Sequence, residues 1–110
     1  VDVGSGYGRF AMYAALSTPC QSVVGIELHE GRYAVAEKMR KEQAEEGVKN
    51  LQFKCGDVRK VGLPEQTTHL YMCSTCFSTK LHNDIVELAP NSVKCIITLK
   101  EFNVKAISFQ

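Results

Sequence analysis

Residues 1–10, VDVGSGYGRF, are the most informative segment for the fold class. A short apolar, β-branched segment runs directly into glycines at alternate positions, Gly4, Gly6 and Gly8. This order predicts a strand that ends in a tight turn, followed at once by a helix. Backbone N–H groups at such a helix start attract an anionic or polar ligand group. A plain strand-to-helix turn that binds no ligand is the alternative left open.

Strands and helices alternate along the rest of the chain. Apolar runs predict strands over residues 1–3, 22–28, 51–55, 68–73 and 92–99, and the start of a sixth over 104–109. Helical patterns cover residues 9–17, 29–47 and 79–88. The side chains expected to face inward from the last two helices are Val35, Ala36, Met39, Leu81, Ile85 and Leu88.

Alternation of this kind predicts a doubly wound, mostly parallel α/β sheet with helices on both faces. The strand at 22–28 is apolar enough to be buried on both sides. Ligands of such sheets bind outside the carboxyl ends of the strands. The loops that follow the strands are therefore the places to look for a functional site.

Composition sets further bounds. The 110 residues are 45% hydrophobic and 23% charged with a net charge of +1, which fits one globular domain over residues 1–110. No global field attracts nucleic acid, and no apolar run of about 18 residues predicts a membrane span. The five cysteines suit reduced, small apolar side chains. Because the chain starts at Val1 with a very short first strand, we expect an incomplete core that is part of a longer protein.

Two acids follow the second and third strands. Glu27 lies 19 residues after Gly8, where a carboxylate can accept both hydroxyls of a ribose. Asp57 follows the third strand, in the next loop of the same cleft, where a carboxylate can accept a bond from an adenine amino group. A dinucleotide fold requires a small residue where Arg9 stands, so the glycine spacing favours a different nucleoside ligand.

The segments DVGSGYG (2–8), GIEL (25–28) and CGDV (55–58) together resemble the class I S-adenosylmethionine-dependent methyltransferases. This resemblance covers nearly the whole chain. It implies a Rossmann-like core that binds S-adenosylmethionine and releases S-adenosylhomocysteine. The residues it implies for cofactor binding are Asp2, Gly4, Ser5, Gly6, Gly8, Arg9, Glu27, Asp57, Val58 and Cys73.

Within that class the chain is most similar to the disruptor-of-telomeric-silencing (Dot) family of histone lysine methyltransferases. The similarity rests on the glycine loop and on CSTCF (73–77) and LKEF (99–102). It differs from the family at Arg9 and Val58, and at Cys73 and Ser74, where the family has asparagines. The resemblance implies a nuclear enzyme that methylates a nucleosomal histone H3 lysine.

Three residues are then implied to position the substrate: Cys73, Ser74 and Phe77. Two other readings stay open. One is a class I methyltransferase with another acceptor, a different protein or a small molecule, for which a cytoplasmic location is expected. The other is a degenerate domain that binds the cofactor or a partner and transfers nothing. None of these readings includes a membrane partner, and the sequence does not indicate an oligomeric state.

The pair Cys73-x-x-Cys76 resembles half of a zinc site, but the sequence has no second half with ligand spacing. We therefore expect structural thiols and no metal. His29, His69 and His82 are scattered and are expected to be exposed or packed rather than ligands. His29 is the exception, since it follows Glu27 closely enough to border the ribose site.

Overall fold

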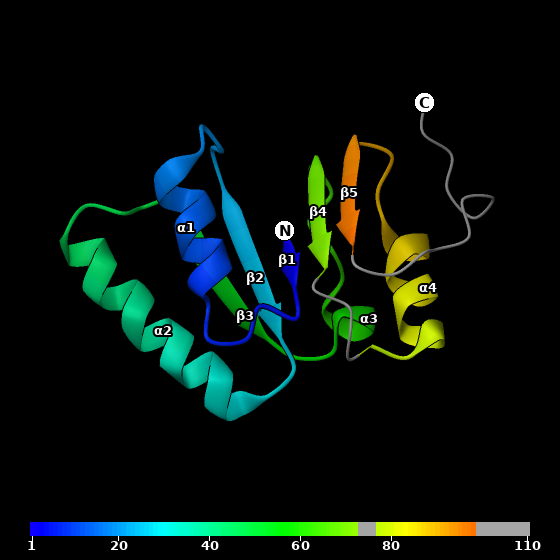
Figure 1. Cartoon of the computed structure of the whole chain (residues 1–110), viewed down its shortest axis with the longest axis horizontal. Helices are drawn as coiled ribbons and strands as arrows, with labels where there is room; N and C mark the ends of the chain where they lie inside the picture. The colour runs from blue at the N-terminus through cyan, green and yellow to red at the C-terminus, as the bar shows by residue number, and fades with distance from the viewer. Residues whose placement is uncertain (73–76, 99–110) are drawn as a thin grey trace.

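A computed structural model describes residues 1–72 and 77–98 of the chain. Its five strands form one sheet in the order β3-β2-β1-β4-β5, and every neighbouring pair is parallel (Figure 1). The strands are β1 (Asp2–Val3), β2 (Val23–Glu27), β3 (Leu51–Cys55), β4 (His69–Met72) and β5 (Cys95–Thr98). The predicted doubly wound, parallel α/β architecture is confirmed.

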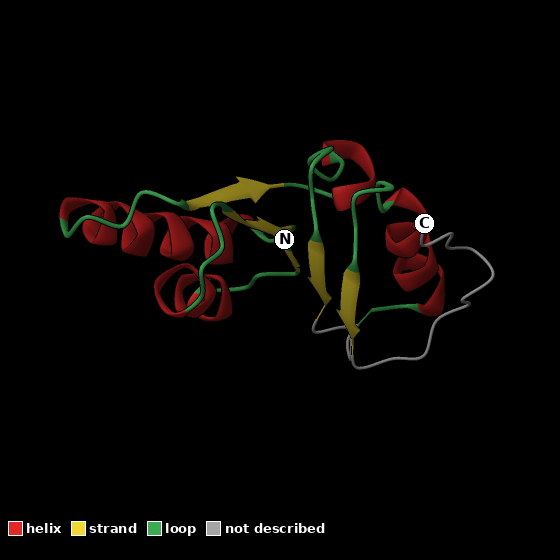
Figure 2. Cartoon of the chain, turned by 90° about the horizontal axis from the view of Figure 1, so that it is seen from above, coloured by secondary structure: helices red, strands yellow, loops and turns green. Residues whose placement is uncertain are grey.

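Helices cover both faces of this sheet (Figure 2). The described helices are α1 (Arg9–Ser17), α2 (Glu30–Glu45), α3 (Val58–Val61) and α4 (Thr79–Leu88). One core lies between α1, α2 and the β2–β3 half, around Ala11, Ala36 and Phe53. The other lies between α3, α4 and the strands, around Met72 and Ile85. As predicted, all five residues of β2 are buried.

Two inward-facing predictions are wrong. Val35 is 51% exposed, because α2 packs on the sheet through Ala36, which is fully buried. Leu88 is 38% exposed, because the buried side of α4 is centred on His82 and Ile85. A small residue in α2 and a polar one in α4 thus take places that a purely apolar pattern gives to larger side chains.

Most predicted strands are longer than the observed ones, and α3 was not predicted. The expected strands at 22–28, 68–73 and 92–99 begin later than predicted, at Val23, His69 and Cys95, and the first of them also ends earlier, at Glu27. The expected sixth strand at 104–109 lies outside the described residues. No helix in residues 1–72 and 77–98 is long and apolar enough to cross a membrane.

An aromatic contact joins α1 to β4. Phe10 of α1 stacks on Tyr71 of β4, with ring centroids 3.9 Å apart and an angle of 14° between the planes. Tyr71 pairs with Asp2 in the parallel register, so this stack lies beside the first strand. The contact fixes the start of α1, and with it the glycine loop, against the centre of the sheet.

Candidate functional site

The glycine loop connects the carboxyl end of β1 to α1. Gly4, Gly6 and Gly8 all have positive φ, at 76°, 58° and 87°. A Cβ on Gly8 would lie 2.5 Å from Phe53 Cζ, so both the backbone and the packing there require glycine. A Cβ on Gly6 would meet nothing within 4 Å. The middle of the loop therefore faces open space, as a turn that approaches a ligand should.

Glu27 fastens this loop to the end of β2. Its Oε1 accepts the backbone N–H of Gly6 at 2.8 Å, and its Oε2 accepts the backbone N–H of His29 at 2.9 Å. The residue is only 5% exposed, and Arg32 Nη1 lies 4.0 Å from Oε2. A carboxylate offers about four acceptor positions, so about two remain for further donors such as a pair of hydroxyls.

Asp2, at the end of β1, and Ser5, within the glycine loop, are both buried and both lie next to Gly25. Asp2 pairs with Gly25 in the β1–β2 register, and a Cβ on Gly25 would lie 2.9 Å from Ser5 Cβ. Within the described residues, neither Asp2 Oδ1 nor Ser5 Oγ has a hydrogen-bond partner. Buried polar atoms without partners are rare, and they mark places where a ligand or water completes the structure.

The pKa of Asp2 is shifted by its surroundings in this site. Burial raises the pKa of Asp2 to about 6; the Val1 ammonium opposes this rise and the negative charge of Glu27 adds to it. A positive charge on a bound ligand would stabilise the ionised form of this buried carboxylate. The loop, the two acids and Ser5 therefore fit a ligand that carries hydroxyls and a cationic centre, as S-adenosylmethionine does.

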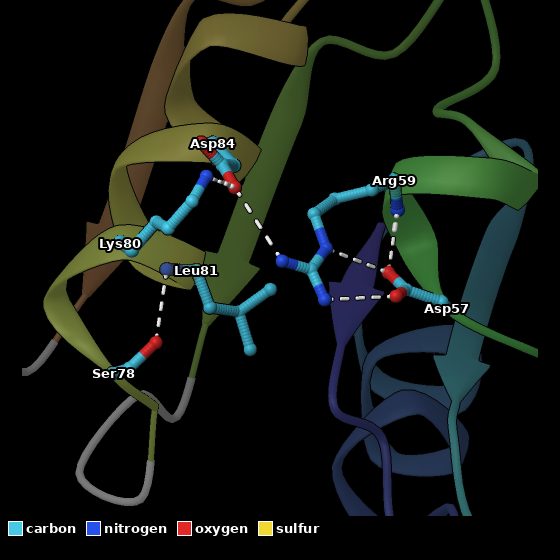
Figure 3. Close-up of polar contacts among 6 residues, drawn as sticks. All are labelled: Asp57, Arg59, Ser78, Lys80, Leu81 and Asp84. Carbon is cyan, nitrogen blue, oxygen red and sulfur yellow. Dashed lines mark hydrogen bonds and ion pairs between the residues drawn. The ribbon is translucent and has the colours of Figure 1, made fainter.

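Asp57 lies in the loop after β3 and caps α3. Its Oδ1 accepts the backbone N–H of Arg59 at 2.9 Å. The Arg59 guanidinium adds two bonds, from Nε to Oδ1 at 3.1 Å and from Nη2 to Oδ2 at 2.9 Å (Figure 3). This pairing with Arg59 lowers the pKa of Asp57 to about 2, so the carboxylate is ionised at neutral pH.

Three other residues predicted for the site have different surroundings: Phe77, Arg9 and Val58. Phe77 reaches the glycine loop, since a Cβ on Gly4 would lie 2.8 Å from Phe77 Cζ. Arg9 is exposed in the first turn of α1. Val58 is 5% exposed and belongs to the core next to α3 and α4. Cys73 and Ser74 lie outside the described residues.

The structure thus gathers the loop, Glu27 and Phe77 at the carboxyl edge of the sheet, while Val58 packs inside. Sequence reasoning missed Arg59 as the partner of Asp57. An arginine two residues after an N-cap aspartate was the available signal. It also missed that His29 caps α2, where its Nδ1 accepts the backbone N–H of Arg32 at 3.3 Å. Residues 1–72 and 77–98 contain no cluster of three metal-ligating side chains, and Cys73 and Cys76 lie outside that part.

Solved structures share the fold of this chain. No curated protein matches the chain. YcgJ from Bacillus subtilis aligns with a TM-score of 0.65 and 19% identity, over 86% of this chain and 41% of its own. A S-adenosylmethionine-dependent methyltransferase from Clostridium acetobutylicum aligns with a TM-score of 0.64 and 14% identity, over 84% of this chain and 37% of its own. At these identities the likeness shows a shared fold.

A third structure, a S-adenosylmethionine-dependent methyltransferase from Aquifex aeolicus, aligns with a TM-score of 0.65 and 19% identity, over 97% of this chain and 62% of its own. The chain spans less than two thirds of the length of each of these relatives. A protein-family model described as a methyltransferase domain matches residues 1–98. Because that match covers nearly the whole sequence, the chain belongs to the class I methyltransferase domain family, whose methyl donor is S-adenosylmethionine.

Proposed function

We propose that the full-length protein transfers a methyl group from S-adenosylmethionine to an acceptor other than a histone lysine. The cofactor supplies an electrophilic methyl group on a sulfonium. The observation that carries the cofactor part of the proposal is a pair of buried atoms without partners, Asp2 Oδ1 and Ser5 Oγ, at a loop that faces open space at Gly6. A plain structural turn has no need for two unsatisfied polar atoms.

Each polar group of the site has a role in this proposal. The loop and Asp2 hold the amino-acid end of the cofactor, where an ammonium and a sulfonium carry positive charge next to the buried carboxylate. Glu27 accepts the ribose hydroxyls with the positions that Gly6 and His29 leave open. Asp57, kept ionised by Arg59, accepts the adenine amino group.

The acceptor enters at the carboxyl edge of the sheet on the β4 side of the loop. Phe77 follows β4 in sequence, and its ring lies against Gly4. An acceptor that enters at this edge therefore passes the ring of Phe77. Methyl transfer needs a nucleophile in line with the sulfonium and little acid–base chemistry. The residues of this chain therefore contribute positioning and electrostatics rather than a proton relay.

The family comparisons favour this broad acceptor class over the histone lysine. The matched family is the general methyltransferase domain, and none of the comparisons supports the Dot family in particular. The two relatives above that are named by activity are S-adenosylmethionine-dependent methyltransferases. Of the segments that carry the Dot resemblance at the acceptor, the structure describes Phe77 alone, so the lysine acceptor and a nuclear location stay a second proposal.

A two-acceptor assay tests the function. The full-length protein is incubated with S-adenosylmethionine labelled on the methyl group, once with nucleosomes and once with a deproteinised metabolite extract plus a non-histone protein fraction. We expect label in the second mixture and none on histone H3. Label on a histone H3 lysine would establish the second proposal instead. Cofactor binding without label in either mixture would indicate a binding domain that transfers nothing.

A further inference from the structure

Arg59, on the short helix α3, joins the loop after β3 to α4. Two parallel bonds connect its guanidinium to the Asp57 carboxylate, at 3.1 and 2.9 Å. The remaining nitrogen, Nη1, lies 3.5 Å from Asp84 Oδ2 in α4. That same oxygen accepts Lys80 Nζ at 3.0 Å. Figure 3 shows the guanidinium between the two carboxylates, with Asp57 on one side and α4 on the other.

We propose that Arg59 is a positioning residue for recognition of the cofactor's base, acting through Asp57. The inference rests on the proposed function, because it concerns how that site distinguishes adenine from other purines. A carboxylate has about four acceptor positions. Arg59 occupies three of them on Asp57, two on Oδ1 with its backbone N–H and Nε, and one on Oδ2 with Nη2. One position on Oδ2 remains.

A partner has to fix the orientation of the Asp57 carboxylate, because the torsions of an aspartate side chain do not fix it. The terminal torsion of an aspartate side chain is broad, and the Asp57 side chain is 23% exposed. The planar, two-pronged guanidinium holds both oxygens at once, which a single ammonium cannot do. Asp84 holds the far side of the guanidinium, so the orientation of Asp57 depends on α4 as well as on α3.

A carboxylate oriented in this way distinguishes a purine that presents a hydrogen-bond donor from one that presents an acceptor. The amino group of adenine donates to the free position on Oδ2. A purine with a carbonyl oxygen in its place presents an acceptor to an acceptor, and a site built to receive a donor rejects such an analogue strongly. Arg59 therefore determines how sharply the site prefers an adenine nucleoside, although it need not touch the base.

Calorimetric titration of the full-length protein with S-adenosylhomocysteine and S-inosylhomocysteine tests this inference, since the two ligands differ only at purine position 6 and in the N1 proton that accompanies the carbonyl. We expect the wild type to prefer S-adenosylhomocysteine by about tenfold or more. Arg59→Gln should reduce this preference by roughly threefold or more, since the loosened carboxylate makes a poorer bond. Arg59→Lys should behave like Arg59→Gln, and Lys60→Gln on the same helix is the matched control that keeps the preference. In an Asp57→Asn background, Arg59→Gln should change nothing further.

The outcomes separate this inference from the function beneath it. Equal weakening of both ligands by Arg59→Gln, or no weakening, would overturn the role of Arg59 while leaving cofactor binding established. A wild type that binds both ligands equally would do the same. A folded wild type that binds neither would overturn the proposed function and this inference together.

Discussion

The backbone N–H of Gly6 donates to Glu27 Oε1 at 2.8 Å, which ties the glycine loop to the end of β2. The other oxygen of Glu27 receives the N–H of His29, the cap of α2. One buried carboxylate thus joins the loop after β1, the end of β2 and the start of α2. These are the segments that the proposed cofactor site requires in a fixed arrangement.

Removing this carboxylate should cost stability as well as binding. Glu27→Ala leaves two backbone N–H groups without their acceptors, and we expect the free energy of unfolding to fall by about 2 kcal/mol or more. Glu27→Gln keeps one carbonyl oxygen and should lose less. Chemical denaturation measures both, with the exposed Glu30→Ala as the matched acidic control. Equal stability of Glu27→Ala and Glu30→Ala would show that the two bonds do not hold the loop.

Substitutions at Gly6 and Gly8 distinguish the role of the loop in ligand binding from its role in packing. Alanine at either position adopts an unfavourable left-handed backbone, at a cost of about 1 kcal/mol. Alanine at Gly8 also meets Phe53 at 2.5 Å, whereas alanine at Gly6 meets nothing within 4 Å. Gly8→Ala should therefore lower stability more than Gly6→Ala. Gly6→Ala should weaken cofactor binding in a protein that stays folded. Thermal unfolding and calorimetry together check the pair, and normal cofactor binding by Gly6→Ala would contradict the account.

Asp2 should make stability depend on pH. Burial raises its pKa in the folded protein from 3.8 to about 6. The folded state therefore binds more protons than the unfolded state between these values, and stability falls as the pH rises through this window. The loss above pH 6 amounts to at most about 3 kcal/mol. Asp2→Asn should remove this dependence and be the more stable protein at about pH 7. Denaturation curves between about pH 4 and 7 measure it, and parallel curves for both proteins would contradict the burial of this charge.

The stack of Phe10 on Tyr71 should contribute to holding α1 against the sheet. Phe10→Ala should lower the free energy of unfolding by about 1 kcal/mol beyond the loss of apolar area. Tyr13→Ala, at a position of α1 that is 66% exposed, should change it by less than about 0.5 kcal/mol. Urea denaturation of the two variants compares them directly. A loss from Tyr13→Ala as large as that from Phe10→Ala would show that the stack adds nothing.

Much of the fold follows from patterns in the sequence, because strand and helix periods are local properties. The alternation of apolar segments with amphipathic ones predicts the parallel sheet and places the glycine loop, Glu27 and Asp57 after successive strands. Two side-chain orientations escape it. Val35 is 51% exposed and Leu88 is 38% exposed, because α2 and α4 pack through Ala36 and through His82 and Ile85 instead.

The contacts of the site are harder to predict. The Gly6–Glu27 bond depends on the register that places Val3 beside Ile26, which only the assembled sheet fixes. The pairing of Arg59 with Asp57 depends on the short helix α3, which has too few residues for a periodic signal. Sequence reasoning thus finds which residues reach the carboxyl edge, while their bonds to one another follow from tertiary geometry.

Calorimetric titration with S-adenosylmethionine shows whether the polar groups at the glycine loop bind this cofactor. The titration compares full-length wild type with Glu27→Ala and with Glu30→Ala. We predict saturable binding at one site for the wild type and Glu30→Ala, and its loss in a Glu27→Ala protein that circular dichroism shows to be folded. Absence of binding by folded wild type, or equal affinity in Glu27→Ala, would show that these groups do not form the cofactor site.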